Sequence, residues 1–149
     1  MEKTINNTTN ENKKTRVAAY VRFIAEPAIP GYGHDAQYED YKEKITSNPN
    51  YEFVGVYADE VSTDTRENFD AMIKDALDGK IDLIIIKSVS RLGRNAAENL
   101  NIIKPLRDKG VGIYFEHQNM NTIDPRFDLV IAVLQSLAAE EEYDETDEE

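Results

Sequence analysis

The 149-residue sequence contains no cysteine and only two histidines, His34 and His117. The absence of cysteine excludes disulfide scaffolds, zinc ribbons and thiol catalysis. Two histidines cannot make a three-ligand zinc site without help from carboxylates, and neither has ligand partners at a diagnostic spacing. We therefore expect neither a metal nor a cofactor. His34 is expected at the surface, and His117 at the end of a strand.

Long apolar segments are missing too. No stretch approaches the ~20 apolar residues of a membrane span. The first residues, rich in Asn, Thr and Lys, have no apolar segment of the kind that a secretion signal needs. Such a composition cannot form a core, so residues 1–14 are expected to be a disordered leader, and the protein is expected in the cytosol. No glycine-rich phosphate loop of the GxGxxG or GxxxxGK type occurs.

Basic residues are few, with 17 Lys and Arg against 29 Asp and Glu, which gives a net charge of −12. The acidity is concentrated, because residues 140–149 hold eight acids and no base, leaving 21 acids and 17 bases, or −4, elsewhere. An evenly acidic protein would repel nucleic acid, but this uneven distribution leaves nucleic acid open as a ligand. We expect one domain over residues 15–142 and a solvated acidic tail over residues 143–149.

Apolar runs alternate with helical patterns, which predicts an α/β domain with a parallel sheet. Strands are expected at 16–23, 51–58, 82–88 and 111–116, with a short fifth near 119–122. The continuous apolar run at 82–88 is typical of a central strand buried on both faces. Helices are expected at 35–48 with Asp35 as cap, at 68–78, from the cap Asn95 to 109, and at 127–141. Pro105 predicts a kink or an early end in the third of these helices.

The last expected helix is apolar on two sides. One stripe consists of Phe127, Val130, Ile131, Leu134 and Ala138, and the other of Leu129, Val133 and Leu137. A helix of this kind is either deeply buried or packs against a partner chain. Both interpretations stay open at this stage.

Four arginines are expected at one edge of the sheet. Arg91 and Arg94 follow the central strand, Arg22 lies at the end of the first strand, and Arg66 lies in the loop after the second. The carboxyl ends of parallel strands form the ligand crevice of such sheets, and a helix start offers free N–H groups to an anion. The arginines therefore predict a phosphate site, unless they are ordinary solvated loop charges.

Longer motifs support the phosphate interpretation. The segments AYVRF, YADEVSTDTRENFDAMIKDAL, KIDLIIIKSVSRLGRN and NTID resemble the catalytic domain of serine recombinases, the resolvase/invertase family, over about residues 16–142. The sequence looks most similar to the large members found in mobile elements. The resemblance implies a three-layer α/β/α domain with a five-stranded, mostly parallel sheet whose last strand is antiparallel.

In that family a serine at the end of the first strand attacks a DNA phosphodiester without a metal, and arginines stabilise the transition state. The family motif Tyr-x-Arg-x-Ser here ends in Ile24. The resemblance thus implies that strand cleavage is lost, because an isoleucine side chain has no lone pair for the attack. Ser88 and Ser90 flank the arginine segment, but nothing in the sequence places either of them for attack.

The resemblance also assigns roles to residues that this sequence keeps. Phosphate contacts fall on Arg22, Arg66, Arg91 and Arg94, and further motif positions on Tyr20, Gln37, Asp59 and Ser62. The family's DNA-directed helix is replaced here by acidic residues, which would repel phosphate.

Several functional hypotheses follow. The first is a recombinase-domain homologue that does not cut DNA. It would bind the phosphate backbone weakly, or pair through residues 127–141 with itself or with an active recombinase. The alternative without a function is a degenerate copy whose arginines have simply not yet been lost. The second is an active recombinase domain, either using a displaced hydroxyl or belonging to a larger protein. The third is a DNA-mimicking inhibitor that acts through residues 140–149.

Overall fold

A five-stranded sheet forms the centre of the protein in the computed structural model, which describes residues 13–147, with side chains up to Glu142. The strand order is β2-β1-β3-β4-β5. β1 (Thr15–Phe23), β2 (Tyr51–Glu60), β3 (Leu83–Ile86) and β4 (Gly112–Phe115) are parallel, and β5 (Met120–Asn121) pairs antiparallel with β4. This confirms the expected mixed sheet with the apolar strand β3 at its centre. Most of the expected leader, residues 1–12, lies outside the described residues.

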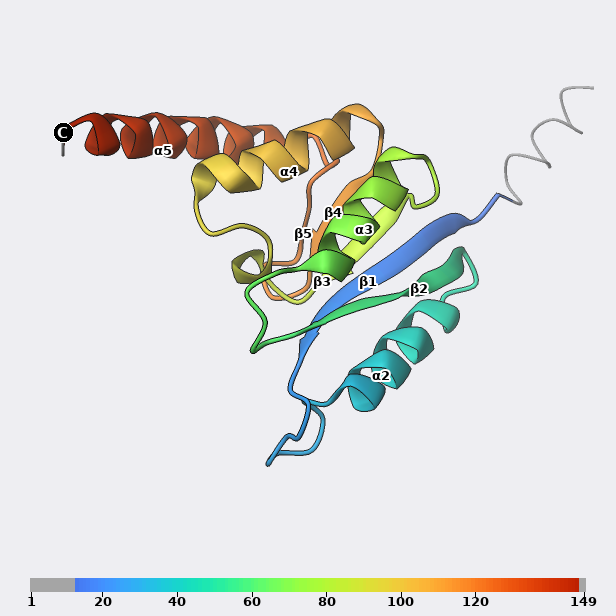
Figure 1. Ribbon diagram of the computed structural model, residues 1–149. Coiled ribbons are helices and arrows are strands. Elements are labelled where there is room, and N and C mark those ends of the chain that lie inside the picture. Colours follow the sequence, from blue (N-terminus) through green and yellow to red (C-terminus); the bar gives the residue numbers. More distant parts are fainter. Residues whose placement is uncertain (1–12, 148–149) are drawn as a thin grey trace, which may run out of the picture.

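Helices cover both faces of the sheet (Figure 1). α2 (His34–Thr46) packs on one face, against the β1 residues Val17, Ala19 and Val21. α3 (Glu67–Leu77), α4 (Ala96–Asp108) and α5 (Phe127–Asp147) pack on the other face. There they meet Ala18 and Tyr20 of β1, because successive side chains of a strand point to opposite faces. The three-layer α/β/α arrangement is therefore confirmed.

One expectation about a helix start is wrong. Gly33, and not Asp35, is the N-cap residue of α2, it makes no side-chain capping hydrogen bond, and Asp35 lies in the first turn. Of the two outcomes expected at Pro105, a kink or an early end, the early end does not occur, because α4 continues to Asp108, close to the expected residue 109. Both Pro105 and Asn101 are exposed, so the Asn101 carbonyl that loses its N–H donor can be hydrated instead.

α5 is longer than expected, since its backbone continues past residue 141 to Asp147. Residues 138–142 are alanines and glutamates, which favour helix, and residues 143–149 contain no glycine or proline that would stop it. The first five residues of the expected acidic tail therefore continue the helix.

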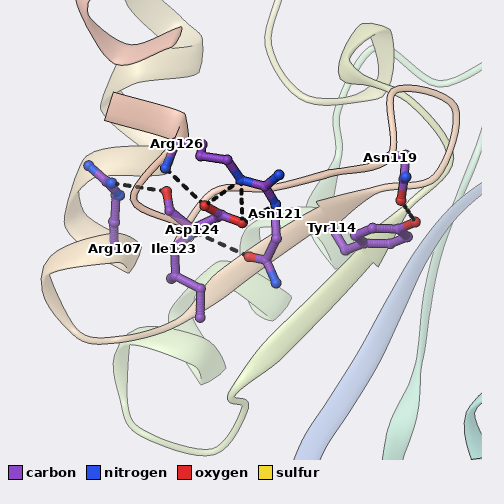
Figure 2. A network of polar contacts seen from close by, with 7 residues as sticks. All are labelled: Arg107, Tyr114, Asn119, Asn121, Ile123, Asp124 and Arg126. Carbon is purple, nitrogen blue, oxygen red and sulfur yellow. Dashed lines mark hydrogen bonds and ion pairs between the residues drawn. The ribbon is translucent and has the colours of Figure 1, made fainter. Parts of the chain in front are cut away.

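A compact polar turn sets where α5 begins (Figure 2). Asp124 accepts the backbone N–H of Arg126 at 2.9 Å and binds the Arg126 guanidinium, with a shortest contact of 2.7 Å. These hydrogen bonds lower the pKa of Asp124 to about 2. The Asn121 side chain accepts the Ile123 N–H at 3.1 Å, and Arg107 of α4 pairs with Asp128 in the first turn of α5. α5 is thereby fixed to both the sheet and α4.

The two apolar stripes of α5 have different surroundings. The stripe that begins at Phe127 packs against the core shared with α3 and α4. In the second stripe, Leu129 is 73% exposed, Val133 51% and Leu137 44%. Deep burial of both stripes within this chain is thus ruled out. Within residues 13–147, no helix combines the length and apolar character needed to cross a bilayer.

Candidate phosphate-binding site

The carboxyl edge of the sheet brings the four expected arginines together. Arg22 lies near the end of β1, Arg66 directly precedes α3, Arg91 ends a short 3-10 helix (Val89–Arg91), and Arg94 precedes α4. All four line one open hollow of about 750 Å³. Asp64, Asp70 and Glu98 lie on its walls as well, so the hollow is basic but not uniformly so.

Two of these arginines are engaged with the protein itself. Arg66 donates to the carbonyls of Arg91 and Leu92 at 2.7 and 2.5 Å, and its guanidinium lies 3.9 Å from the ring centroid of Phe69. Arg22 donates to the Tyr20 hydroxyl at 3.4 Å and to two carbonyls in the turn after β2. Arg66 in particular holds the backbone of the Arg91 segment in place.

Arg91 and Arg94 differ from this pair. Neither guanidinium donates a hydrogen bond to any residue that the structure describes, and Arg94 is exposed. A guanidinium has five N–H donors in a fork that matches two phosphate oxygens. Arg91 and Arg94 are therefore the two arginines of the hollow that are ready for an anion.

The start of α4 is not the free anion site that the sequence suggested. Its N–H groups already have acceptors in the protein: Asn95 takes that of Glu98 at 2.9 Å and Glu98 takes that of Arg94 at 2.8 Å. Glu141, which is distant in sequence and lies on α5, accepts hydrogen bonds from the backbone N–H groups of Ala96 at 2.9 Å and Ala97 at 3.3 Å. The spacing of Asn95 and Glu98 is a sequence signal for such capping, whereas nothing in the sequence points to Glu141.

Asp59, at the end of β2, is a buried carboxylate that ties β1 to the start of α3. It is 6% exposed and accepts the Tyr20 hydroxyl at 2.8 Å. Its two oxygens also accept the backbone N–H groups of Asn68 and Phe69, each at 3.0 Å, in the first turn of α3. Asp59 thus caps α3 from a neighbouring strand, a role that sequence reasoning missed because Arg66 stands at the cap position. Burial raises the pKa of Tyr20, the hydrogen bond from Arg22 opposes this, and Asp59 adds to it.

Gln37 and Ser62, the remaining motif positions, have different surroundings. The Gln37 amide donates to the carbonyls of Arg22 and Tyr32 at 3.0 and 3.1 Å, so it ties the segment after β1 to α2. Ser62 is exposed in the turn after β2 and is not among the residues that line the arginine hollow, although its neighbour Thr63 is.

Ile24 follows β1 directly, at the position where the family resemblance expects the nucleophile. It is 40% exposed, and its N–H donates to the Tyr32 carbonyl at 2.9 Å. Its side chain lines a small hollow with apolar walls together with Pro27, Ala28, Ile29 and Tyr32. Residues 24–30 carry no hydroxyl group.

Ser90 is the serine that lines the arginine hollow. Its hydroxyl lies 2.6 Å from that of Ser88, which is itself buried. No described histidine or carboxylate is bonded to either hydroxyl to accept a proton. Within the described residues, neither serine is therefore bonded to a base that could activate it.

A second hollow, of about 330 Å³, lies beside the first and shares Arg22 and Arg91 with it. In its wall Glu116 accepts hydrogen bonds from Tyr41 and, at 3.3 Å, from Lys44. Burial and the carboxylate beside it raise the pKa of Tyr41 well above its usual range. Sequence reasoning missed this network, which joins residues from α2 and from the end of β4.

In the part of the chain that the structure describes, no group of three or more histidines, aspartates or glutamates has a geometry that could hold a metal ion. His34 and His117 are both exposed, and His34 pairs with the adjacent Asp35 at 3.1 Å.

In open α/β sheets, ligands bind in the crevice at the carboxyl ends of the strands, and the four arginines lie at this edge. The family model "Resolvase, N terminal domain" matches residues 17–148, and the chain belongs to this family. The resemblance seen in the sequence motifs is thereby confirmed at the level of the family.

Two solved structures share the fold. One is a resolvase family site-specific recombinase from Streptococcus pneumoniae, 28% identical, with a TM-score of 0.72 and coverage of 91% of this chain and 93% of that one. The other is the N-terminal catalytic domain of TP901-1 integrase, 18% identical, with a TM-score of 0.70 and coverage of 88% and 99%. A search of curated protein sequences finds no match.

Proposed function

We propose that this resolvase-family domain binds the DNA phosphate backbone through its arginine hollow but does not cleave DNA. Two features support the proposal. Ile24 follows β1 at the position where the family resemblance expects the nucleophile. Arg91 and Arg94 line the arginine hollow, and their guanidiniums donate no hydrogen bond to a described residue. In-line attack needs a lone pair on the attacking atom, which an alkyl side chain lacks. Binding needs no nucleophile, since it depends on charge and hydrogen-bond donors.

The four arginines have different roles in this proposal. Arg91 and Arg94 contact phosphate, because their donors are not used inside the protein. Arg66 and Arg22 shape the hollow, because their guanidiniums donate hydrogen bonds to main-chain carbonyls. Contacts of this kind position a protein on DNA without reading the base sequence. The binding is therefore weak, salt-sensitive and independent of sequence.

The exposed apolar face of α5, made of Leu129, Val133 and Leu137, supports a second part of the proposal. A second copy of this chain, or a related recombinase, covers this face. The protein would then occupy one place in an assembly of recombinases. We propose the cytosol as the location and a mobile element, of the kind that encodes large serine recombinases, as the source of its DNA site.

Binding of a labelled DNA duplex, measured by fluorescence anisotropy over a range of salt concentrations, tests the phosphate contacts. Arg91→Ala/Arg94→Ala is expected to weaken binding at least about tenfold at ~50 mM salt and to lower the salt slope by about two. Lys104→Ala/Lys109→Ala, which removes the same charge from exposed positions outside the hollow, is the matched control. Equal loss in both double variants would show that only net charge matters and would overturn the proposed site.

A competent enzyme with a displaced hydroxyl is the second candidate, favoured by the position of Ser90 in the hollow. Such an enzyme would form a covalent protein–DNA adduct that Ser90→Ala abolishes.

A further inference from the structure

The loop after β1 carries a cluster of exposed apolar side chains, and it projects beyond the end of that strand (Figure 1). Ile24 and Tyr32 are exposed, and Ile29 is 64% exposed. With Pro27 and Ala28 they line the hollow with apolar walls, here called the apolar hollow, which has a volume of about 250 Å³. Neighbouring apolar side chains that stay in contact with water often mark a binding surface.

Hydrogen bonds close this loop at its base, so the apolar hollow is built into the fold. The Ile24 N–H donates to the Tyr32 carbonyl at 2.9 Å, and the Gln37 amide donates to the same carbonyl at 3.1 Å. Pro27 and Pro30 have fixed φ angles, which reduces the number of conformations open to the loop. A ligand that enters the hollow therefore has little chain to order, which favours binding.

Tyr32 belongs to the walls of two hollows, the apolar hollow and the second hollow of about 330 Å³. In the second hollow the Lys87 ammonium lies 5.9 Å from the centroid of the Tyr32 ring. Neither Lys87 nor Arg91 makes an ion pair or donates a side-chain hydrogen bond to a described residue. Tyr32 is thus bordered by apolar side chains in one hollow and by unpaired cations in the other.

The second hollow carries a net positive charge. Its walls contain four basic residues and two acids: Arg22, Lys44, Lys87, Arg91, Asp40 and Glu116. Both acids pair with Lys44, at 3.5 and 3.3 Å. The charge left for a ligand is therefore that of the remaining cations, which suits an anion.

A nucleotide has the two properties that these hollows complement, a flat apolar base and a negatively charged phosphate. Bases stack on aromatic side chains and enter pockets with apolar walls, while phosphates bind Lys and Arg. Hollows of about 250 and 330 Å³ are far too small for a duplex. A base that enters must therefore have left the helical stack.

We propose that the apolar hollow and the second hollow together bind one unstacked nucleotide of a DNA strand, with its base against Tyr32 and its phosphate at Lys87 and Arg91. The inference rests on the proposed function, because it specifies which form of DNA the site prefers. Ile24 then has a role of its own, as part of the wall that receives the base. DNA with an unpaired nucleotide binds more tightly than an intact duplex, because an unpaired base costs less to extrude.

The test compares a duplex that carries a single-nucleotide bulge with an intact duplex of the same length in the anisotropy assay. The wild type is expected to bind the bulged duplex about tenfold more tightly. Tyr32→Ala should lose this preference and keep its affinity for the intact duplex, whereas Tyr32→Phe, which keeps the ring, should retain the preference. A preference that persists in Tyr32→Ala would overturn the inference.

The failure of the inference and that of the proposed function give different results. Equal affinity of the wild type for the two duplexes overturns the inference alone. If Arg91→Ala/Arg94→Ala binds the intact duplex as the wild type does, the proposed function itself has failed.

Ile29 and Ile123 provide a matched pair of exposed isoleucines. Ile123 is exposed in the turn before α5 and lines neither hollow. Ile29→Ser is expected to weaken binding of the bulged duplex about threefold, because it removes apolar surface that the base would cover, and Ile123→Ser should leave binding unchanged. Equal effects of the two substitutions would contradict a base pocket in this loop.

A photochemical cross-link gives a local readout on the wild type, which decides the matter if Tyr32→Ala does not fold. 5-Iodouracil at the bulged position reacts on irradiation with an aromatic ring stacked against it. Mass spectrometry of the digested adduct is expected to identify Tyr32. Cross-links only to residues outside the two hollows would overturn the inference.

Discussion

At the carboxyl edge of the sheet, some side chains hold the site together, and others are left free to contact a ligand. Asp59 holds it: one buried carboxylate joins the Tyr20 hydroxyl of β1 to two N–H groups of α3. Arg66 has a similar role, through two carbonyls of the Arg91 segment. Arg94 is exposed and its guanidinium donates no hydrogen bond within the described chain, which is why we propose it as a phosphate contact. A motif shared with a family therefore contains residues of both kinds.

Asp59→Ala tests the anchoring role. The substitution leaves a buried hydroxyl and two helix N–H groups without their acceptor, so we expect the free energy of unfolding to fall by about 3 kcal/mol. Urea denaturation followed by circular dichroism measures this change. Asp64→Ala, at an exposed position with no hydrogen bond recorded to a described residue, should stay within about 0.5 kcal/mol of the wild type. A similar small effect for both variants would show that Asp59 does not anchor α3.

Asp82 allows a test of pH dependence at the start of β1. It accepts the backbone N–H of Arg16 at 2.8 Å and two guanidinium N–H groups at 3.0 and 2.9 Å. The side-chain hydrogen bond from Arg16 holds the pKa of Asp82 below its ordinary value. An acid with a lowered pKa stabilises the fold above the pKa of the unfolded chain, about 4, and this stabilisation is lost as the pH falls through the folded-state pKa.

Asp82→Asn is therefore expected to destabilise the protein at pH 7 and to make little difference at the acidic end of the folded range. Because both partners are about one-third exposed, with side-chain exposures of 34% each, the effect at pH 7 should be about 1 kcal/mol or less. Thermal unfolding of both proteins from pH 7 down to pH 3 measures it. A difference that grows as the pH falls would contradict this account of the ion pair.

At the scale of elements, the feature with the clearest consequence is the outer face of α5. Its inner stripe is buried against α3 and α4, while Leu129, Val133 and Leu137 remain exposed on the surface. Removing an apolar face of this size from water favours association with another chain. The polar turn in Figure 2 fixes the start of α5, so this face is presented from a firmly held element.

Leu129→Ser/Val133→Ser tests self-association. We expect the wild type to form a dimer in sedimentation velocity runs at tens of micromolar, and the double variant to sediment as a monomer with unchanged helix content. Gln135→Ser/Ala139→Ser, which changes exposed α5 positions outside the apolar face, should behave as the wild type does. A monomeric wild type at every concentration would contradict pairing of two copies through α5.

Local patterns were enough to predict the elements, but contacts distant in sequence were not. The apolar run of β3 predicted its central place, and Asn95 was predicted correctly as the cap of α4. The expected cap Asp35 was wrong, because Gly33 already takes that position. Within the site, the sequence predicted that the arginines gather. It could not predict that Arg66 is bound to carbonyls or that Glu141 fills the start of α4, since both depend on how distant elements pack.

At the scale of the whole molecule, most of the acidic excess and the arginine hollow lie in different parts of the chain. The net charge of −12 comes mostly from residues 140–149, while the sheet edge keeps a hollow lined by four arginines. Glu141 belongs to the acidic segment and contacts the helix start at this edge. One residue of the acidic segment therefore contacts the helix that begins next to the basic site. The chain is a recombinase-family domain, and we propose that it binds DNA without cutting it.

A covalent-adduct assay tests the central claim most directly. The full chain is incubated with a duplex nicked near its centre, and denaturing gels then show whether protein has become linked to DNA. Ile24→Ser, fused to a DNA-binding domain whose target lies in the duplex, is compared with the same fusion of the wild type. The account predicts no adduct from the wild type at any time, and an adduct from Ile24→Ser if the arginine site is intact. A wild-type adduct at any serine, Ser90 above all, would contradict it.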